Sequence, residues 1–122
     1  MDIFRNEILI EHNKARLKYG KVPPLALDEN LNAKAQNYAN YLASNDLGLI
    51  HSDSKDMGEN LFQYYSSDLK LCNANLVVDS FVSEAKFYNY ENPKLSNVYS
   101  AGHFTQVVWK NSSLLGIYSL WI

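Results

Sequence analysis

The chain has 122 residues, of which 47% are hydrophobic, and this length and composition fit one domain with a single sizeable core. Lysines and arginines number 11 against 13 acids, for a formal net charge of −2, and both signs are interspersed, so no basic stripe indicates nucleic acid binding. No segment approaches the run of about 20 apolar residues that a membrane-spanning helix needs. Asp2, Arg5 and Glu7 interrupt any apolar signal peptide at the N-terminus.

Three segments have the apolar spacing of amphipathic helices. The first is expected over residues 2–19, where Gly20 is a stop signal, and its His12 is interpreted as structural. The second runs from the N-cap Asp28 to near Gly48, and the third from residue 75 to about residue 88. The second is the clearest, because its apolar residues recur at i, i+4, i+7 and i+11: Leu31, Ala35, Tyr38 and Leu42.

The remaining segments are less periodic. Residues 49–71 are rich in Ser, Asp and Gly, which predicts a long structured loop with a short strand at 60–64. Residues 113–122 are apolar and rich in β-formers, which predicts a strand. Residues 103–109 alternate enough for a strand but also fit two helical turns, and the sequence leaves both readings open.

Four side chains are candidates for chemistry. Glu84 falls on the apolar stripe of the third helix, where a carboxylate needs a partner because an unpaired buried charge is strongly unfavourable. His51 and His103 lie in loop-rich stretches, and Glu59 follows the permissive Gly58. Two imidazoles and two carboxylates gathered in one cleft would bind a divalent metal such as zinc, or exchange protons with a substrate.

Plainer readings compete with this hypothesis. The spacing of the four residues matches no local metal motif, and a single loop histidine is more often a surface or capping residue than a ligand. Glu84 would then pair with a base from another element, such as Arg16. Cys72 is the only cysteine, so it forms no internal disulfide, and without a nearby histidine it is interpreted as a buried or idle thiol.

The segment Gly102-His103-Phe104-Thr105-Gln106-Val107-Val108-Trp109-Lys110-Asn111-Ser112 resembles the first signature of the CAP superfamily, which comprises cysteine-rich secretory proteins, antigen 5 and pathogenesis-related 1 proteins. Phe81 stands where the family's Trp-x-x-Glu segment usually has tryptophan, with Glu84 in place. Other landmarks follow in the family's order: His12-Asn13-x-x-Arg16, Pro23-Pro24-Leu25, His51-Ser52 and Gly58-Glu59-Asn60.

The resemblance implies an α+β fold, a three-layer α-β-α sandwich with a central three-stranded antiparallel sheet, and a short helix at 103–109. It also implies a cleft formed by His51, Glu59, Glu84 and His103, with the two histidines as ligands of zinc or another divalent cation. The family continues into a last strand and a second signature, so we expect residues 1–122 to form a single CAP domain that lacks both. An unpaired sheet edge of this kind favours association.

The leading functional hypothesis from this resemblance is a binding module for a divalent metal and for sterol or acidic lipid at a peripheral membrane surface. One alternative is a protein-interaction domain with a vestigial cleft, which binds other proteins or forms a homodimer. A weaker one is a His/Glu hydrolase with Ser52 or Ser66 as nucleophile, although no motif positions either serine. The chain is most similar to the Golgi-associated pathogenesis-related 1 subgroup, which implies self-association and an intracellular location at the Golgi periphery; a fragment of a secreted protein would be extracellular.

Overall fold

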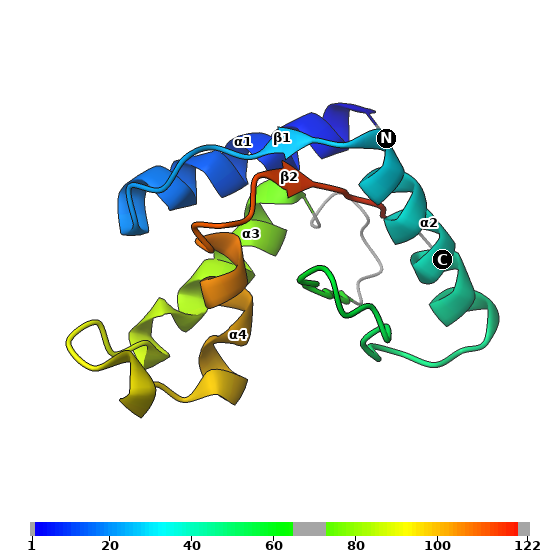
Figure 1. Cartoon of the computed structure of the whole chain (residues 1–122). Helices are drawn as coiled ribbons and strands as arrows, with labels where there is room; N and C mark the ends of the chain where they lie inside the picture. The colour runs from blue at the N-terminus through cyan, green and yellow to red at the C-terminus, as the bar shows by residue number, and fades with distance from the viewer. Residues whose placement is uncertain (1, 65–72, 120–122) are drawn as a thin grey trace.

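The computed structural model describes residues 2–64 and 73–119 (Figure 1). Within these ranges, helices dominate and strands are short. None of the described helices has the length and hydropathy needed to cross a membrane. The elements in chain order are α1 (Asp2–Tyr19), β1 (Ala26–Leu27), α2 (Glu29–Ser44), α3 (Ala74–Val82), the 3-10 helices η2 (Ser83–Phe87) and η3 (Pro93–Leu95), α4 (Val98–Val107) and β2 (Leu114–Leu115).

Side-chain caps fix where three of the helices begin. Asp28 caps α2, Asn73 caps α3 and Asn97 caps α4, each by accepting a hydrogen bond from a backbone N–H in the first turn at 2.8 to 3.2 Å. Such caps satisfy donors that have no partner within the helix. The predicted first helix and the Asp28 cap are confirmed, whereas α2 ends at Ser44, four residues before Gly48, because Asp46 takes a positive φ of 50°.

Two further segments differ from the simplest reading of the sequence. The third predicted helix is α-helical only to Val82 and then tightens into the 3-10 helix η2. The stretch 103–109 lies largely in α4, as the family resemblance implied. The strand predicted at 60–64 is wrong, because this backbone makes no ladder pairing and is held by side chains, with Phe62 packed edge-to-face on Phe81 at 6.2 Å.

A buried guanidinium fixes where both strands begin. Arg16 is 0% exposed, and its Nε donates to the carbonyl of Pro23 at 2.7 Å. Its terminal nitrogens donate to the carbonyls of Val107, Trp109 and Ser112 at 2.9 to 3.0 Å. Pro23 lies just before β1, and the other three residues lie before β2. The two strands therefore leave one anchor in the same direction.

This anchor explains the direction in which the two described strands pair. They form a two-stranded parallel sheet with Ala26 opposite Leu114, so the expected three-stranded antiparallel sheet is not confirmed among the described residues. The N–H of Ala26 donates to Ser113 and that of Asp28 to Leu115, both at 3.0 Å. In an antiparallel pair, β1 and β2 would enter the sheet from opposite ends. Arg16 prevents this arrangement for these two strands, because it binds the segments that precede both of them.

The segment around β2 is enclosed by helices on two sides. A Cβ at Gly116 would clash with the backbone of Leu31, so only glycine allows α2 to lie this close. The N–H of Ile117 also donates to Asn32 Oδ1 of α2 at 2.7 Å. On the other side, Leu115 and Ile117 pack against a buried cluster from α1 and α3: Ile8, Ala74 and Val78. A layered order of helix, strand and helix is thus present around a very small sheet.

Some predictions fall on residues 65–72 and 120–122, outside the described ranges. These concern Cys72, Ser66, the end of the long loop and the end of the C-terminal strand. Of the predicted strand at 113–122, only Leu114–Leu115 pairs as a strand among the described residues.

Replacing Arg16 tests its role as the anchor. Arg16→Met removes the donors of four carbonyl groups, and at about 1 kcal/mol per hydrogen bond we expect the free energy of unfolding to fall by about 3 to 4 kcal/mol. Arg16→Lys recovers little, because an ammonium cannot reproduce the planar fork of donors. Urea unfolding followed by circular dichroism measures both. The exposed Lys34→Met is the control, with an expected change within about 0.5 kcal/mol; equal stabilities for Arg16→Met and this control would contradict the assignment.

Acid should destabilise the fold through His12. Burial lowers the pKa of this imidazole from 6.5, the hydrogen bond to the Ile8 carbonyl partly opposes that change, and the charge of Arg16 adds to it. The unfolded chain therefore binds the proton more readily, so stability is full above pH 6.5 and falls as the pH drops from 6.5 toward the folded pKa. We expect His12→Gln to flatten this dependence in unfolding curves measured between about pH 8 and 5.5. An unchanged slope would show that other groups cause it.

Candidate functional site

Glu84 and His103 form the more enclosed of two histidine–glutamate pairs. Glu84 lies on η2 and His103 on α4, and Glu84 Oε2 is 2.7 Å from His103 Nδ1. Its other oxygen accepts the backbone N–H groups of His103 at 2.8 Å and Phe104 at 3.3 Å. The imidazole lies flat on Phe81, with ring centroids 5.0 Å apart. Glu84 therefore has a partner, but it is His103 and not Arg16.

His51 and Glu59 form the second pair, in the loop after α2. Glu59 Oε1 is 2.7 Å from His51 Nδ1 and accepts the backbone N–H of Ser52 at 2.9 Å. Burial of Glu59 opposes ionisation, but the hydrogen bonds from Ser52 and His51 outweigh it and lower the pKa of this carboxyl. Glu59 is therefore an ionised acceptor at neutral pH.

The two pairs are joined through the loop that carries Glu59. The next residue, Asn60, donates its side-chain N–H to the carbonyl of His103 at 3.2 Å. Gly58 lies against the side chain of Gln106 on α4, and any Cβ at position 58 would overlap it. Gln106 is itself held by a hydrogen bond to the Ser112 hydroxyl at 3.3 Å. A glycine on one side of Glu59 and an amide on the other thus dock this loop on the helix of His103.

Both histidines contact their glutamate through the same ring nitrogen, Nδ1. Because a carboxylate can only accept, Nδ1 is the donor in each pair, and in the neutral imidazole Nε2 then keeps its lone pair. This is the arrangement of metal-binding histidines, in which an outer carboxylate fixes the tautomer. The side chain of His51 is 66% exposed and that of His103 is 37% exposed, so solutes can reach both.

Few of the described side chains could act as metal ligands together with these histidines. Among the described residues, no group of three or more His, Cys, Asp or Glu side chains is placed to hold a metal ion. The structure places the four predicted site residues as two pairs, whose carboxylates are bonded to the imidazoles. The histidine nitrogens are therefore the free donors, and any cation would take its other ligands from solvent or from a bound molecule.

Sequence reasoning did not assign a role to Asn60 or Gln106. In the sequence, Asn60 belongs to a family motif and Gln106 to a signature, and neither pattern indicates a contact between them and the site. The signal that could have indicated these contacts is Gly58, because a glycine is often needed where the backbone lies close to another part of the structure, here the side chain of Gln106.

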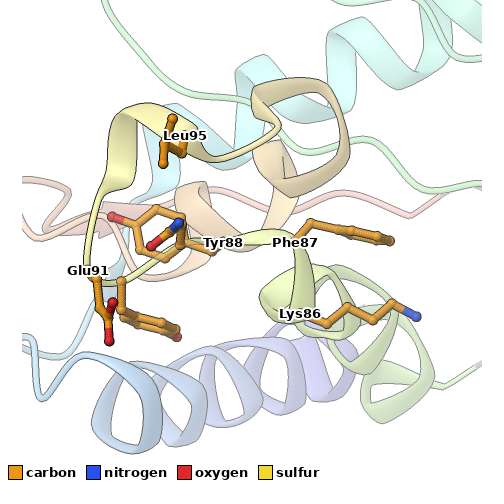
Figure 2. A pocket seen from close by; sticks show the side chains of 7 residues that line it. Lys86, Phe87, Tyr88, Glu91 and Leu95 are labelled. Atoms are coloured by element: carbon orange, nitrogen blue, oxygen red, sulfur yellow. The ribbon is translucent and has the colours of Figure 1, made fainter.

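An open groove of about 560 Å³ lies near η2 and η3 (Figure 2). Phe87, Tyr90 and Leu95 are exposed here. The side chains of Lys86 and Phe87 point away from Tyr88 and Glu91. Three aromatic side chains line the groove, and the complete lining is Lys86, Phe87, Tyr88, Asn89, Tyr90, Glu91 and Leu95.

Comparison with known proteins identifies the family of this chain. Residues 9–120 match the family model described as "CAP: Cysteine-rich secretory protein family", so the chain belongs to this family. The match confirms the resemblance and supports an α-β-α sandwich.

Similar proteins come from animals and plants. The chain is 42% identical over 117 residues to the human Golgi-associated plant pathogenesis-related protein 1, covering 93% of this chain and 71% of that protein. It is 40% identical over 112 residues to pathogenesis-related protein 1A1 of Solanum lycopersicum, covering 92% and 60%. It is 42% identical over 111 residues to the basic form of pathogenesis-related protein 1 of Nicotiana tabacum, covering 90% and 58%. The chain thus spans only part of the length of each relative.

Replacing Glu84 tests its control of His103. Glu84→Gln keeps an acceptor for the backbone but places an NH₂ donor where the imidazole needs an acceptor. We expect His103 to move its proton to Nε2, seen in long-range proton–nitrogen correlation spectra, and the free energy of unfolding to fall by about 1 to 3 kcal/mol. The exposed Glu91→Gln is the matched control. An unchanged His103 tautomer in Glu84→Gln would refute this role.

Proposed function

We propose that this protein is a CAP-family binding module and that it does not turn over a substrate. Its two histidine–glutamate pairs offer the Nε2 atoms of His51 and His103 to one divalent cation, with zinc as the best match. The observation that carries the proposal is the 2.7 Å contact between each Nδ1 and its carboxylate. Imidazole nitrogen is a preferred zinc donor, and the outer carboxylate raises its basicity.

The donor set fits an open site better than a closed structural one. Structural zinc sites have four protein ligands, whereas two imidazoles leave positions for water or an anionic group of a ligand. When bound, the cation would supply positive charge and Lewis acidity. Glu59 and Glu84 would hold the two imidazoles in position, and Asn60 would keep the loop of His51 on the helix of His103.

Calorimetric titration with zinc tests this site at a pH of about 7.5, where unperturbed imidazoles are mostly neutral. We expect one ion to bind, and His51→Ala and His103→Ala each to abolish most of the binding heat. His12→Gln is the control, because that buried histidine lies on α1 and should leave binding unchanged. Retained binding in both alanine variants would overturn the proposal. If the natural chain binds two zinc ions and each alanine variant loses only one of them, the two histidines do not share a site.

The second part of the proposed function is binding of sterol or acidic lipid at the groove near η2 and η3. Exposed Phe87, Tyr90 and Leu95 give apolar contact area, and Lys86, which lies over the Phe87 ring, provides a cation for an acidic headgroup. The human relative is named for its association with the Golgi. We propose the same location for this chain, at the peripheral surface of the membrane.

Vesicle sedimentation tests the groove. We expect more binding to vesicles that contain phosphatidylserine or cholesterol than to phosphatidylcholine alone. Tyr90→Ser and Leu95→Ser should weaken binding to both, whereas Lys86→Glu should weaken only binding to phosphatidylserine. Tyr99→Ser is the control, because Tyr99 is 96% exposed but lies outside the groove. Equal losses in the control would contradict a specific groove.

Two other outcomes would change the assignment. A folded protein that binds neither zinc nor vesicles would favour the protein-interaction domain. Ester or peptide turnover that Glu59→Ala abolishes would favour a hydrolase.

A further inference from the structure

Tyr38 links helix α2 to the loop that carries His51. Its hydroxyl donates to the carbonyl of Ile50, the residue just before His51, at 2.5 Å. By its spacing in the sequence Tyr38 belongs to the apolar face of α2, but the structure leaves it only partly buried. Its ring stacks on that of Tyr41, one turn further along α2, with centroids 5.9 Å apart. The hydroxyl of Tyr38 therefore faces the loop of the candidate site.

This contact holds one of the two peptide groups that flank the Cα atom of His51. The Ile50 carbonyl and the His51 N–H belong to one planar peptide group, and Tyr38 binds its oxygen. The next peptide group ends in the N–H of Ser52, which donates to Glu59 Oε1 at 2.9 Å. With both planes held, the φ and ψ angles of His51 are fixed, and the contact between Nδ1 and Glu59 orients the ring.

The two site histidines differ in how their backbone is held. His103 lies within α4, whose own hydrogen bonds fix its backbone, and Glu84 accepts its N–H as well. His51 lies in a loop, with a side chain that is 66% exposed. In Figure 1, α2 and α4 stand on opposite sides of the molecule, and the loop after α2 runs between them. Asn60 fastens the far end of this loop to α4, and Tyr38 fastens the end next to α2.

We propose that Tyr38 is a positioning residue for His51, and that its hydroxyl holds the His51 imidazole where it can share a cation with His103. This inference deepens the proposed cation site and rests on it for its functional meaning. A donor that is already in place loses less conformational freedom when the cation binds, so the hydroxyl raises the affinity without touching the ion. Burial and the charge of Glu59 raise the pKa of Tyr38, so the phenol keeps its proton and stays a donor at neutral pH.

Tyr38→Phe tests the inference, because it removes the hydroxyl and keeps the ring. In the metal-free protein, nitrogen-15 relaxation should show greater fast motion of the backbone N–H groups of His51 and Ser52, with that of His103 unchanged. In calorimetry, the zinc dissociation constant should rise about fivefold, which corresponds to the loss of one hydrogen bond. Tyr41→Phe removes a hydroxyl from the same helix and should change neither quantity. Circular dichroism confirms that both variants are folded.

The two measurements separate this inference from the cation proposal. If the natural chain binds no zinc, the proposed cation is wrong, but selective loosening at His51 and Ser52 still supports Tyr38 as the residue that positions this histidine. Unchanged motion at His51 and Ser52 would overturn the inference. Equal loosening at His103 would also overturn it, because the role of Tyr38 would then be general stability. The same holds if the loop loosens while a zinc-binding chain keeps its full affinity.

Discussion

The structure depends on one buried cation that binds four carbonyl oxygens. Arg16 lies on α1, yet its partners are Pro23 and three residues between Val107 and Ser112. Burial lowers the pKa of this guanidinium, and the four acceptors replace the water it has lost. Because it binds the segments just before β1 and β2, the same residue determines the direction of both strands and the position of the C-terminal end of α4.

The candidate site follows from this placement. Val107 is the last residue of α4, and fixing its carbonyl places the helix that carries His103. Glu84 then accepts hydrogen bonds from the backbone N–H and the imidazole of His103, so η2 and α4 are joined at His103. The second pair reaches this region through Asn60. The histidines are thus oriented by hydrogen bonds from three separate parts of the chain.

Local chemistry in the sequence was enough to predict much of the helical structure. Asp28 and the spacing of Leu31, Ala35 and Tyr38 predicted α2, and Gly20 predicted the end of α1. The need of Glu84 for a partner was also foreseeable, because it follows from its place on an apolar stripe. The identity of that partner was not, since His103 and Arg16 are equally available in a linear sequence. The parallel pairing of β1 and β2 could not be predicted for the same reason, because it is set by contacts between Arg16 and residues more than 90 positions away.

That separation has a consequence for how the chain folds. Helices such as α1 and α2 need only nearby residues, and local structure of this kind forms within about a microsecond. The partners of Arg16 before β2 are 91 to 96 residues away, so the loop that joins them must close before the sheet can form. During synthesis from the N-terminus, the ribosome releases α1 long before these carbonyls exist. Arg16 therefore lacks these three acceptors until the segment up to Ser112 has been made, and the pairing of β1 with β2 must follow that step.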